Sequence, residues 1–207
     1  ANSLIILATQ KYQHTRLNKL HGCFYMNDIS RTDFMKYSEK LPNYRFFNRT
    51  INISSFNDNL SEIEKNLLTP LTNTFKTSIS KLSKHITYIF EIDNNFLFEI
   101  AKIRSFNIVY EQKFKQLPYI QAIINCKKSK VHSLIESTTK SISAILGGCD
   151  ELLIQSKNPI ELNLQQQLIL KHESFLHLIS DPLHGSYYIE KLSKSMNGVK
   201  ANRTLKK

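Results

Sequence analysis

The segment Ile86–Tyr110, ITYIFEIDNNFLFEIAKIRSFNIVY, joins a short apolar run to a longer stretch with helical spacing. Residues Ile86–Ile92 are mostly apolar or β-branched, which is typical of a buried strand. From Asn95 to Phe114 the apolar residues recur so that they share one face of a helix: Phe98, Ile100, Ala101, Phe106, Val109 and Tyr110. The segment therefore predicts a strand followed by a helix, the repeating unit of proteins with parallel sheets.

The same alternation continues on both sides of this segment. Further short strands are expected at Leu4–Leu7, Thr50–Ser54, Tyr119–Ile124 and Leu152–Ile154. Helices are expected at Leu60–Leu82 with a break at Pro70, at Val131–Leu146 with a stop at Gly147 and Gly148, and at Asn163–Leu178. The pattern predicts an α/β fold of repeated βα units, and only Lys11–Tyr44 gives no clear assignment.

A turn signal followed by a helix start lies near the C-terminal end, at Asp181–Leu192, DPLHGSYYIEKL. Asp181 before Pro182 favours a turn, and Gly185 tolerates a positive φ angle. Ser186 is suited to cap a helix that begins at Tyr187. On spacing alone, we interpret this segment as a capped surface turn.

Composition excludes several classes of protein. The chain has 207 residues, 41% of them apolar, with only 5 Gly and 5 Pro, which argues against disorder. No apolar run approaches the roughly 18 to 20 residues that span a bilayer, and no leader-like segment starts the chain. Cys23, Cys126 and Cys149 lack metal-ligand spacing, and the seven His residues are dispersed. We therefore expect a soluble cytoplasmic protein with reduced thiols and no metal site.

The formal charge of +11 indicates an anionic partner or a compositional bias. Lys and Arg are scattered, and they are densest at Lys127, Lys128 and Lys130 and in the tail 200–207. No helix-turn-helix, zinc or aromatic-basic sheet motif accompanies the charge. We therefore favour the Lys-, Asn- and Ile-rich composition of an AT-biased coding sequence over a nucleic-acid footprint.

Four segments, in order, resemble signatures of the methylmalonyl-CoA mutase family. Ile86–Tyr110 is similar to a strand followed by F-F-x-E-I-A-K-x-R-A-x-R-x-L-W, and Ser141–Leu153, SISAILGGCDELL, to E-A-M-S-A-I-L-G-G-C-D-S-L. Leu164–Ser174 resembles N-T-Q-L-I-L-Q-E-E-S, and Asp181–Leu192 resembles D-P-x-G-G-S-Y-Y-x-E-x-L. The signature residues retained, which we expect to be structural, are Glu99, Lys102, Arg104, Gly147, Gly148, Asp181, Pro182, Gly185, Ser186 and Tyr187.

The resemblance implies a (β/α)8 barrel, but the chain is too short for a complete one. Such a barrel needs about 250 residues and eight βα units, and about five or six can be counted here. We expect a partial or contracted barrel over residues 1–199, with 1–45 poorly assigned, and a basic tail at 200–207. Its open sheet edge would need cover from a partner chain or from further residues.

The positions that the resemblance assigns to substrate binding have changed. The family pattern R-x-H-C-Q corresponds here to Ile123, Asn125 and Lys127 in place of Arg, His and Gln. The catalytic His of Y-H-M-Q-E-A-G-A corresponds to Asn57, which has no proton to exchange near neutral pH. Asp181 and His184 do not match the cobalt-binding D-x-H-x-x-G motif. We expect no catalytic, cofactor-binding or metal-ligating residue in this chain.

The resemblance implies a small-subunit-like, non-catalytic component of an adenosylcobalamin-dependent methylmalonyl-CoA mutase, which interconverts succinyl-CoA and methylmalonyl-CoA. A mutase large subunit would be its heterodimer partner and would hold the adenosylcobalamin, and the CoA ester would bind at the level of the complex. Whether the chain counts as an enzyme is left open. Glu99 and Lys102, three residues apart, are expected to form a solvated helix pair.

Two alternatives stay open. One is a basic binding module that holds CoA phosphates, acidic protein or nucleic acid through Lys127–Lys130 and the tail, although we do not expect nucleic acid. The other is an inactive relic of the family, which predicts poor folding and no stable partner.

Overall fold

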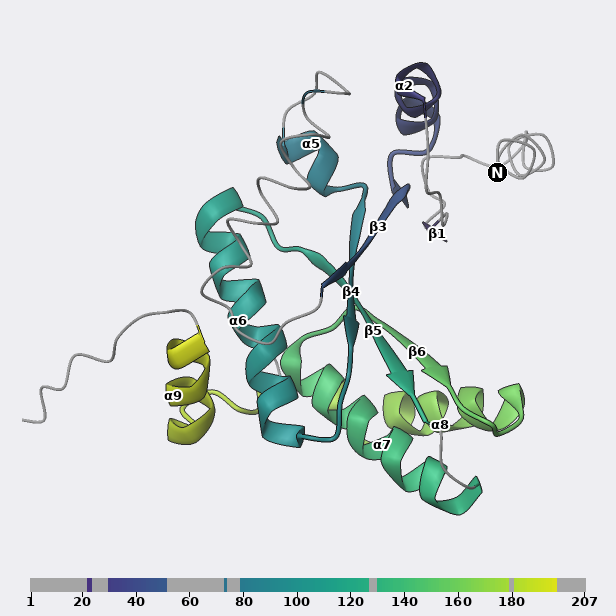
Figure 1. The fold of residues 1–207 in the computed structure, drawn as a ribbon, viewed down its shortest axis with the longest axis vertical. Coiled ribbons are helices and arrows are strands. Elements are labelled where there is room, and N and C mark those ends of the chain that lie inside the picture. The colour runs from purple at the N-terminus through teal and green to yellow at the C-terminus, as the bar shows by residue number, and fades with distance from the viewer. Residues whose placement is uncertain are drawn as a thin grey trace, which may run out of the picture. The chain divides into compact units, whose positions relative to one another are not determined.

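The computed structural model describes residues 22–23, 30–51, 73, 79–126, 130–178 and 181–196 (Figure 1). The chain divides into two compact units. The first comprises residues 1–49 and 62–88, and the second comprises residues 50–61 and 89–207.

The first unit is organised around an aromatic cluster. It contains β1 (Gly22–Cys23), α2 (Arg31–Lys40), β2 (Tyr44–Arg45), α5 (Ile79–Ser83), most of β3 (Phe47–Ile51) and the start of β4 (Ile86–Glu91). Ser30 caps α2, because its hydroxyl accepts a hydrogen bond from the Asp33 N–H at 3.1 Å. The Phe34 ring lies 6.1 Å from Phe46 and 5.5 Å from His85, so the hydrophobic side of α2 packs on the chain around β2 and β3.

The second unit consists of consecutive βα units (Figure 1). The end of β4 leads into α6 (Phe96–Phe114), β5 (Tyr119–Asn125) leads into α7 (Lys130–Gly147), and β6 (Glu151–Gln155) leads into α8 (Ile160–His172). A short 3-10 helix, η3 (Leu176–Leu178), and α9 (Tyr187–Met196) follow. Asn95 starts α6, since its side-chain oxygen accepts from the Phe98 N–H.

The strands form a parallel sheet in the order β3-β4-β5-β6. In β5 and β6 the register pairs Ala122 with Leu152 and Ile124 with Ile154. Residues Ile120, Ala122 and Ile124 are buried, whereas Ile123 and Asn125 on the opposite face are only half-buried. One face of β5 is therefore fully buried. The other face, on which Gln121 is also buried, is partly accessible at Ile123 and Asn125, toward the carboxyl end of the strand. The parallel sheet with its flanking helices is as expected for an α/β fold that forms part of a (β/α)8 barrel.

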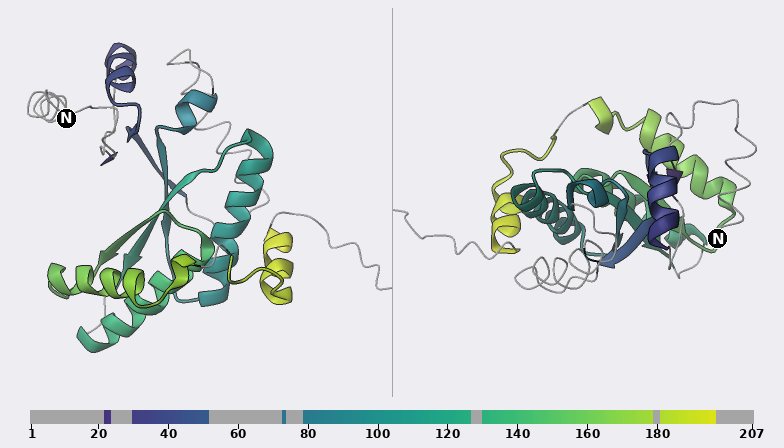
Figure 2. Two further views of the ribbon diagram at one scale, coloured as in Figure 1. Left: turned by 180° about the vertical axis from the view of Figure 1, so that it is seen from behind. Right: turned by 90° about the horizontal axis from the view of Figure 1, so that it is seen from above.

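The most C-terminal helix described, α9, packs on α6 (Figure 2). The Ser105 hydroxyl on α6 donates to the Ser193 carbonyl on α9 at 3.1 Å. Ile189 and Ser193 are the buried residues of α9, and its exposed residues are Tyr187, Tyr188, Lys191, Lys194 and Ser195. No helix among the described residues is both long and apolar enough to cross a bilayer.

Most of the expected elements in the described part of the chain are confirmed. The strands expected at Ile86–Ile92, Tyr119–Ile124 and Leu152–Ile154 are β4, β5 and β6, and the helices expected at Asn95–Phe114 and Val131–Leu146 are α6 and α7. The expected strand Thr50–Ser54 overlaps β3 at residues 50–51, and its remainder lies outside the described residues, as do Leu4–Leu7 and most of Leu60–Leu82. The single barrel domain over 1–199 stays a prediction.

The helix expected at Asn163–Leu178 is wrong at both ends. It begins earlier, at Ile160, because Pro159 has no N–H and its fixed φ favours the start of a helix. It ends at His172, and Phe175 then adopts a left-handed conformation with φ 54°, which a continuing helix does not allow. The last three residues of the expected range, Leu176–Leu178, form the separate turn of η3.

Candidate functional site

The carboxyl ends of β4 and β5 meet at one edge of the sheet, the edge at which ligands bind in barrels of parallel strands. Glu91 ends β4 and Asn125 ends β5. The Asn125 amide donates to the Glu91 carboxylate, with 2.5 Å between Nδ2 and Oε1. The Asn125 side-chain amide therefore already has a hydrogen-bond partner, the Glu91 carboxylate.

Two of the four positions predicted to have lost substrate binding are described. Ile123 and Asn125 lie on the same face of β5, since side chains two residues apart point the same way. The Ile123 carbonyl accepts from the Ile92 N–H at 3.0 Å, which ties β5 to the end of β4. Asn57 and Lys127 lie outside the described residues.

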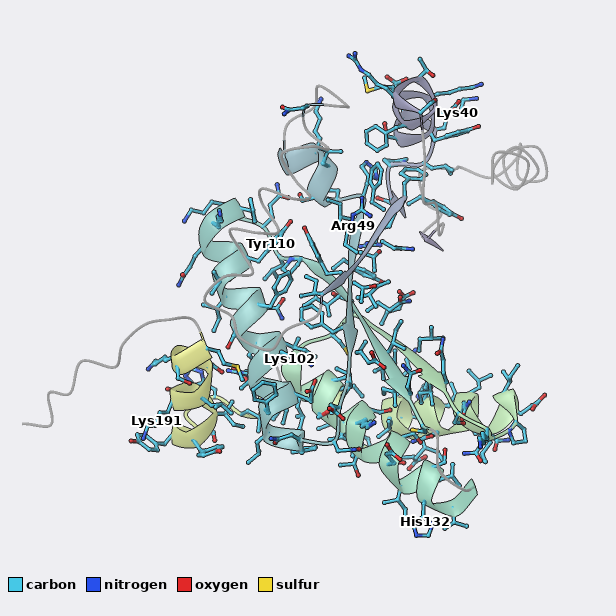
Figure 3. All side chains as sticks on the ribbon, in the orientation of Figure 1. Lys40, Arg49, Lys102, Tyr110, His132 and Lys191 are labelled. Carbon is cyan, nitrogen blue, oxygen red and sulfur yellow. The ribbon has the colours of Figure 1, made fainter. Side chains whose placement is uncertain are left out.

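Lys102, which is labelled in Figure 3, extends from α6 to the same strand edge. Its ammonium donates to the Glu91 carbonyl at 3.0 Å and pairs with the Glu99 carboxylate one turn earlier. The side chains of Glu99 and Lys102 are only 2% and 8% exposed. The prediction of a solvated pair is therefore wrong, because the polar end of a strand lies within reach and accepts one N–H of the buried lysine.

Lys140 repeats this arrangement in the next βα unit. From α7 its ammonium donates to the Asn125 carbonyl at 3.3 Å and pairs with Glu136 Oε1 at 2.9 Å. Both side chains are largely buried, at 7% and 14% exposed. The ends of β4 and β5 are thus each tied to the following helix by a lysine that a helical carboxylate neutralises.

Burial raises the pKa of two groups near this edge, Glu99 and Cys126. Burial raises the pKa of Glu99, and the hydrogen bond and charge of Lys102 offset part of that rise. Burial, with the nearby Glu136 charge, also raises the pKa of the Cys126 thiol. A protonated, buried thiol is a poor nucleophile, so Cys126 fits a packing role.

Sequence reasoning did not single out Glu91, Glu136 or Lys140. The one available signal was weak: Glu136 and Lys140 are spaced i, i+4, which is equally common on exposed helix faces. Nothing in that spacing indicated that both side chains would be buried.

Five of the retained family-signature residues, Arg104, Gly147, Gly148, Asp181 and Pro182, meet at a second place, between α6 and the turn before α9. Arg104 forms a two-pronged ion pair with Asp181, with Nη1–Oδ1 at 2.6 Å and Nη2–Oδ2 at 2.9 Å. Asp181 Oδ1 also accepts from the Leu183 N–H at 3.2 Å. The hydrogen bonds and charge of Arg104 lower the pKa of Asp181, so this carboxylate stays ionised at neutral pH.

The two glycines at the end of α7 lie against α6. A Cβ on Gly147 would lie 2.9 Å from Ile103 Cβ, and Gly148 has φ 93° and accepts from the Asn107 amide at 3.4 Å. Beside them is an open cavity of about 260 Å³. It is lined by Arg104, Asn107, Ile108, Ile145, Leu146, Gly147, Gly148, Leu176, Asp181 and Pro182. These signature residues therefore hold helices and a turn together.

The turn before α9 has the expected form. Gly185 adopts φ 81°, its N–H donates to Glu190 Oε1 at 3.0 Å, and the Glu190 N–H bonds the Ser186 carbonyl at 2.9 Å. Helix α9 then begins at Tyr187, whose ring faces outward. The local hydrogen bonds account for Gly185 and Ser186 without a ligand.

His184 does not fit the role of a cobalt ligand. A ligating His normally has its second nitrogen held by a carboxylate or carbonyl. Here His184 is 84% exposed, its Nδ1 lies 3.8 Å from Asp181 Oδ2, and Asp181 is already bound by Arg104. Among the described residues, no group of three or more His, Cys, Asp or Glu could hold a metal ion.

Comparison with known proteins gives the family. The family model for methylmalonyl-CoA mutase matches residues 73–207, which include α6 to α9 and both residue clusters described above. The chain belongs to the methylmalonyl-CoA mutase family.

The relatives that resemble this chain are much longer. A methylmalonyl-CoA mutase of Rhizobium meliloti is 26% identical over 141 residues, which cover 58% of this chain and 20% of that protein. A 2-hydroxyisobutanoyl-CoA mutase large subunit of Aquincola tertiaricarbonis is 24% identical over 153 residues, covering 62% of this chain and 27% of that protein. The match thus spans about a fifth to a quarter of each relative, and their names alone do not assign an activity to this chain.

Proposed function

We propose that this chain is a small-subunit-like, non-catalytic component of an adenosylcobalamin-dependent methylmalonyl-CoA mutase. The complete enzyme would interconvert succinyl-CoA and methylmalonyl-CoA in the cytoplasm. In this proposal a large subunit provides adenosylcobalamin and the catalytic residues, and this chain contributes by pairing with it.

The observation that carries the proposal is that the described polar side chains at the carboxyl end of β5 already have partners within the protein. Ile123 has no group that could bind a carboxylate or a thioester oxygen. The Asn125 amide is engaged by Glu91, and two lysines of the described helices that reach this edge, Lys102 and Lys140, are paired with Glu99 and Glu136. These contacts favour a structural edge over one that binds an anionic CoA ester.

The signature residues between α6 and the turn before α9 also support the proposal. Arg104 with Asp181, and Gly147 with Ile103, join α6 to its neighbours through close packing and an ion pair. A chain that keeps its packing residues while its substrate positions change is expected of a subunit that assembles without catalysing. His184, for the geometric reason given above, supports a chain that holds no cobalamin itself.

The test is reconstitution with a candidate large subunit from the same source. Isomerisation of succinyl-CoA is measured for this chain alone, for the large subunit alone and for their mixture, and cobalamin binding is followed by its visible absorbance. We expect turnover only with the large subunit present, equimolar co-elution of the two chains, and no absorbance from cobalamin on this chain alone. Turnover or stoichiometric cobalamin binding by the isolated chain would refute the proposal.

Two variants separate assembly from catalysis. Asn125→Ala removes the side chain at a former substrate position and should leave the activity of the mixture unchanged. Arg104→Gln loosens the contact that holds the α9 turn and should weaken co-elution. If Asn125→Ala abolished the activity of a mixture that still assembled, the edge would be catalytic after all.

The alternatives give different results in the same experiment. A folded chain that elutes without the large subunit but binds RNA or CoA with strong salt dependence would favour the basic binding module. A chain that does not fold cooperatively would favour the relic.

A further inference from the structure

Helix α8 carries an apolar stripe on its exposed side. Ile160, Leu164 and Leu168, spaced i, i+4 and i+8, are 81%, 55% and 46% exposed. At about 100° per residue, the stripe lies about 130° around the helix from the buried residues Asn163, Gln166 and Leu170. An apolar row on the outward side of an outer helix is unusual for a surface that faces only water.

The inner side of α8 is fixed, so the stripe cannot turn inward. The Gln166 amide donates to Thr138 Oγ1 at 2.7 Å and its oxygen accepts from the Ser137 hydroxyl at 2.9 Å, both on α7. Leu170 is buried on the same side. The helix is therefore held in one rotation by two hydrogen bonds and a buried leucine.

The charged residues beside the stripe favour a second copy of the same helix as its partner. Glu161 lies in the first turn of α8 and Lys171 in the last, and neither has an ion-pair partner within the described part of the chain. If a second copy of α8 lies antiparallel with its two-fold axis at the level of Gln166, Leu164 of each copy faces Leu168 of the other. The same register brings Glu161 of one copy to the level of Lys171 of the other, twice.

We propose that the α8 stripe is a self-association surface, on which a second copy of this chain packs antiparallel about a two-fold axis. A surface of this kind is isologous, because the same residues contribute from both copies. The Leu164–Leu168 contacts bury apolar area, and the two Glu161–Lys171 pairs fix the register and direction. This association is separate from the proposed pairing with a large subunit, and neither requires the other.

The test is the oligomeric state of the full chain, measured by sedimentation equilibrium up to about 100 μM, a range that includes weak interfaces. We expect a reversible monomer–dimer equilibrium. Leu164→Gln should weaken the dimer by about tenfold or more, because both copies lose an apolar contact. The matched control is Leu117→Gln, which removes another exposed leucine outside the stripe and should leave the dimer unchanged.

Charge reversal tests the register. Glu161→Lys and Lys171→Glu should each weaken the dimer, since each places like charges together twice, and the double reversal should restore it to near the wild-type affinity. Because both charges also lie at favourable ends of the α8 dipole, circular dichroism must show that each variant is folded.

A chain that is monomeric throughout the concentration range, or a dimer equally affected by Leu117→Gln, would overturn the proposal. So would a large subunit that binds the monomer and loses affinity for Leu164→Gln, since the stripe would then belong to that partner.

Discussion

Arg104 and Asp181, 77 residues apart in the chain, form a two-pronged ion pair that ties the middle of α6 to the turn before α9. Two segments that resemble family signatures in the sequence thus meet in the fold. The pair is partly exposed, with side chains 19% and 34% accessible, so its contribution to stability is moderate.

The ion pair can be measured by a double-mutant cycle. Arg104→Gln and Asp181→Asn should each destabilise the protein, and we expect a coupling energy of about 1 kcal/mol from urea unfolding. The matched control is the exposed pair of Lys194 and Glu190, 3.8 Å apart, which should give a coupling near zero. Equal coupling in the two cycles would contradict a special role for Arg104 and Asp181.

Gly147 should not tolerate a side chain. Gly147→Ala places a Cβ against Ile103 Cβ, which belongs to the rigid part of that side chain, so α6 and α7 must separate. We expect a loss of about 1 to 3 kcal/mol in the free energy of unfolding. Gly185→Ala is the comparison: its Cβ meets nothing within 4 Å, and only the positive φ opposes the change, at about 1 kcal/mol. A neutral Gly147→Ala would show that the two helices can move apart freely.

The buried pair of Lys102 and Glu99 should be sensitive to the loss of one partner. Lys102→Met leaves the Glu99 carboxylate buried without its cation, and we expect about 3 to 5 kcal/mol of destabilisation in chemical unfolding. Adding Glu99→Leu should recover much of that loss, because no buried charge remains. Lys157→Met, at an exposed lysine of the same unit, is the control and should be near neutral. Failure of the second substitution to recover stability would point to the Lys102–Glu91 hydrogen bond as the main contribution.

Stability should fall in two steps on acidification. Burial lowers the pKa of His85 despite its hydrogen bond to the Tyr44 carbonyl, so the folded state binds fewer protons than the unfolded state and loses stability below about pH 6.5. The pKa of Asp181 is lowered by Arg104, so its contribution is present above the ordinary value near 3.8 and is lost as pH falls through the folded value.

Thermal unfolding against pH can separate the two groups. His85→Asn should remove the upper step, since the Asn amide can still reach the Tyr44 carbonyl without gaining a charge. Asp181→Asn should remove the lower step and leave the upper one. If the His85→Asn profile kept the upper step, another group would be responsible for it.

Much of the second unit could be predicted from local sequence. The strand and helix from Ile86 to Phe114 followed from apolar spacing, because burial on one face imposes a period of two or of 3.6 residues. The stop of α7 at Gly147 and Gly148, and the turn at Gly185, followed from the backbone freedom of glycine. The end of α8 did not, because the left-handed Phe175 has no local signal of this kind.

The candidate site was predicted only in part. The assignment of Ile123 and Asn125 as changed substrate positions stays a prediction. The sequence singled out Arg104 and Asp181 as signature residues, but it could not show that this pair meet. The sequence-based expectation that Glu99 and Lys102 are exposed to solvent was also wrong, because an i, i+3 charge pair has the same spacing on an exposed helix and on a buried one.

The sequence by itself determined the alternation of strands and helices from Ile86 to Leu146 and the family, because each depends on residue identity and near-neighbour spacing. Only the tertiary structure decided which polar groups are buried and what they contact. Lys102 reaches Glu91, Lys140 reaches Asn125, and Arg104 reaches Asp181 because the sheet and the helix packing bring distant backbone segments to a few ångströms. The cost of burying a charge depends on those partners, and they are fixed only when the chain has folded.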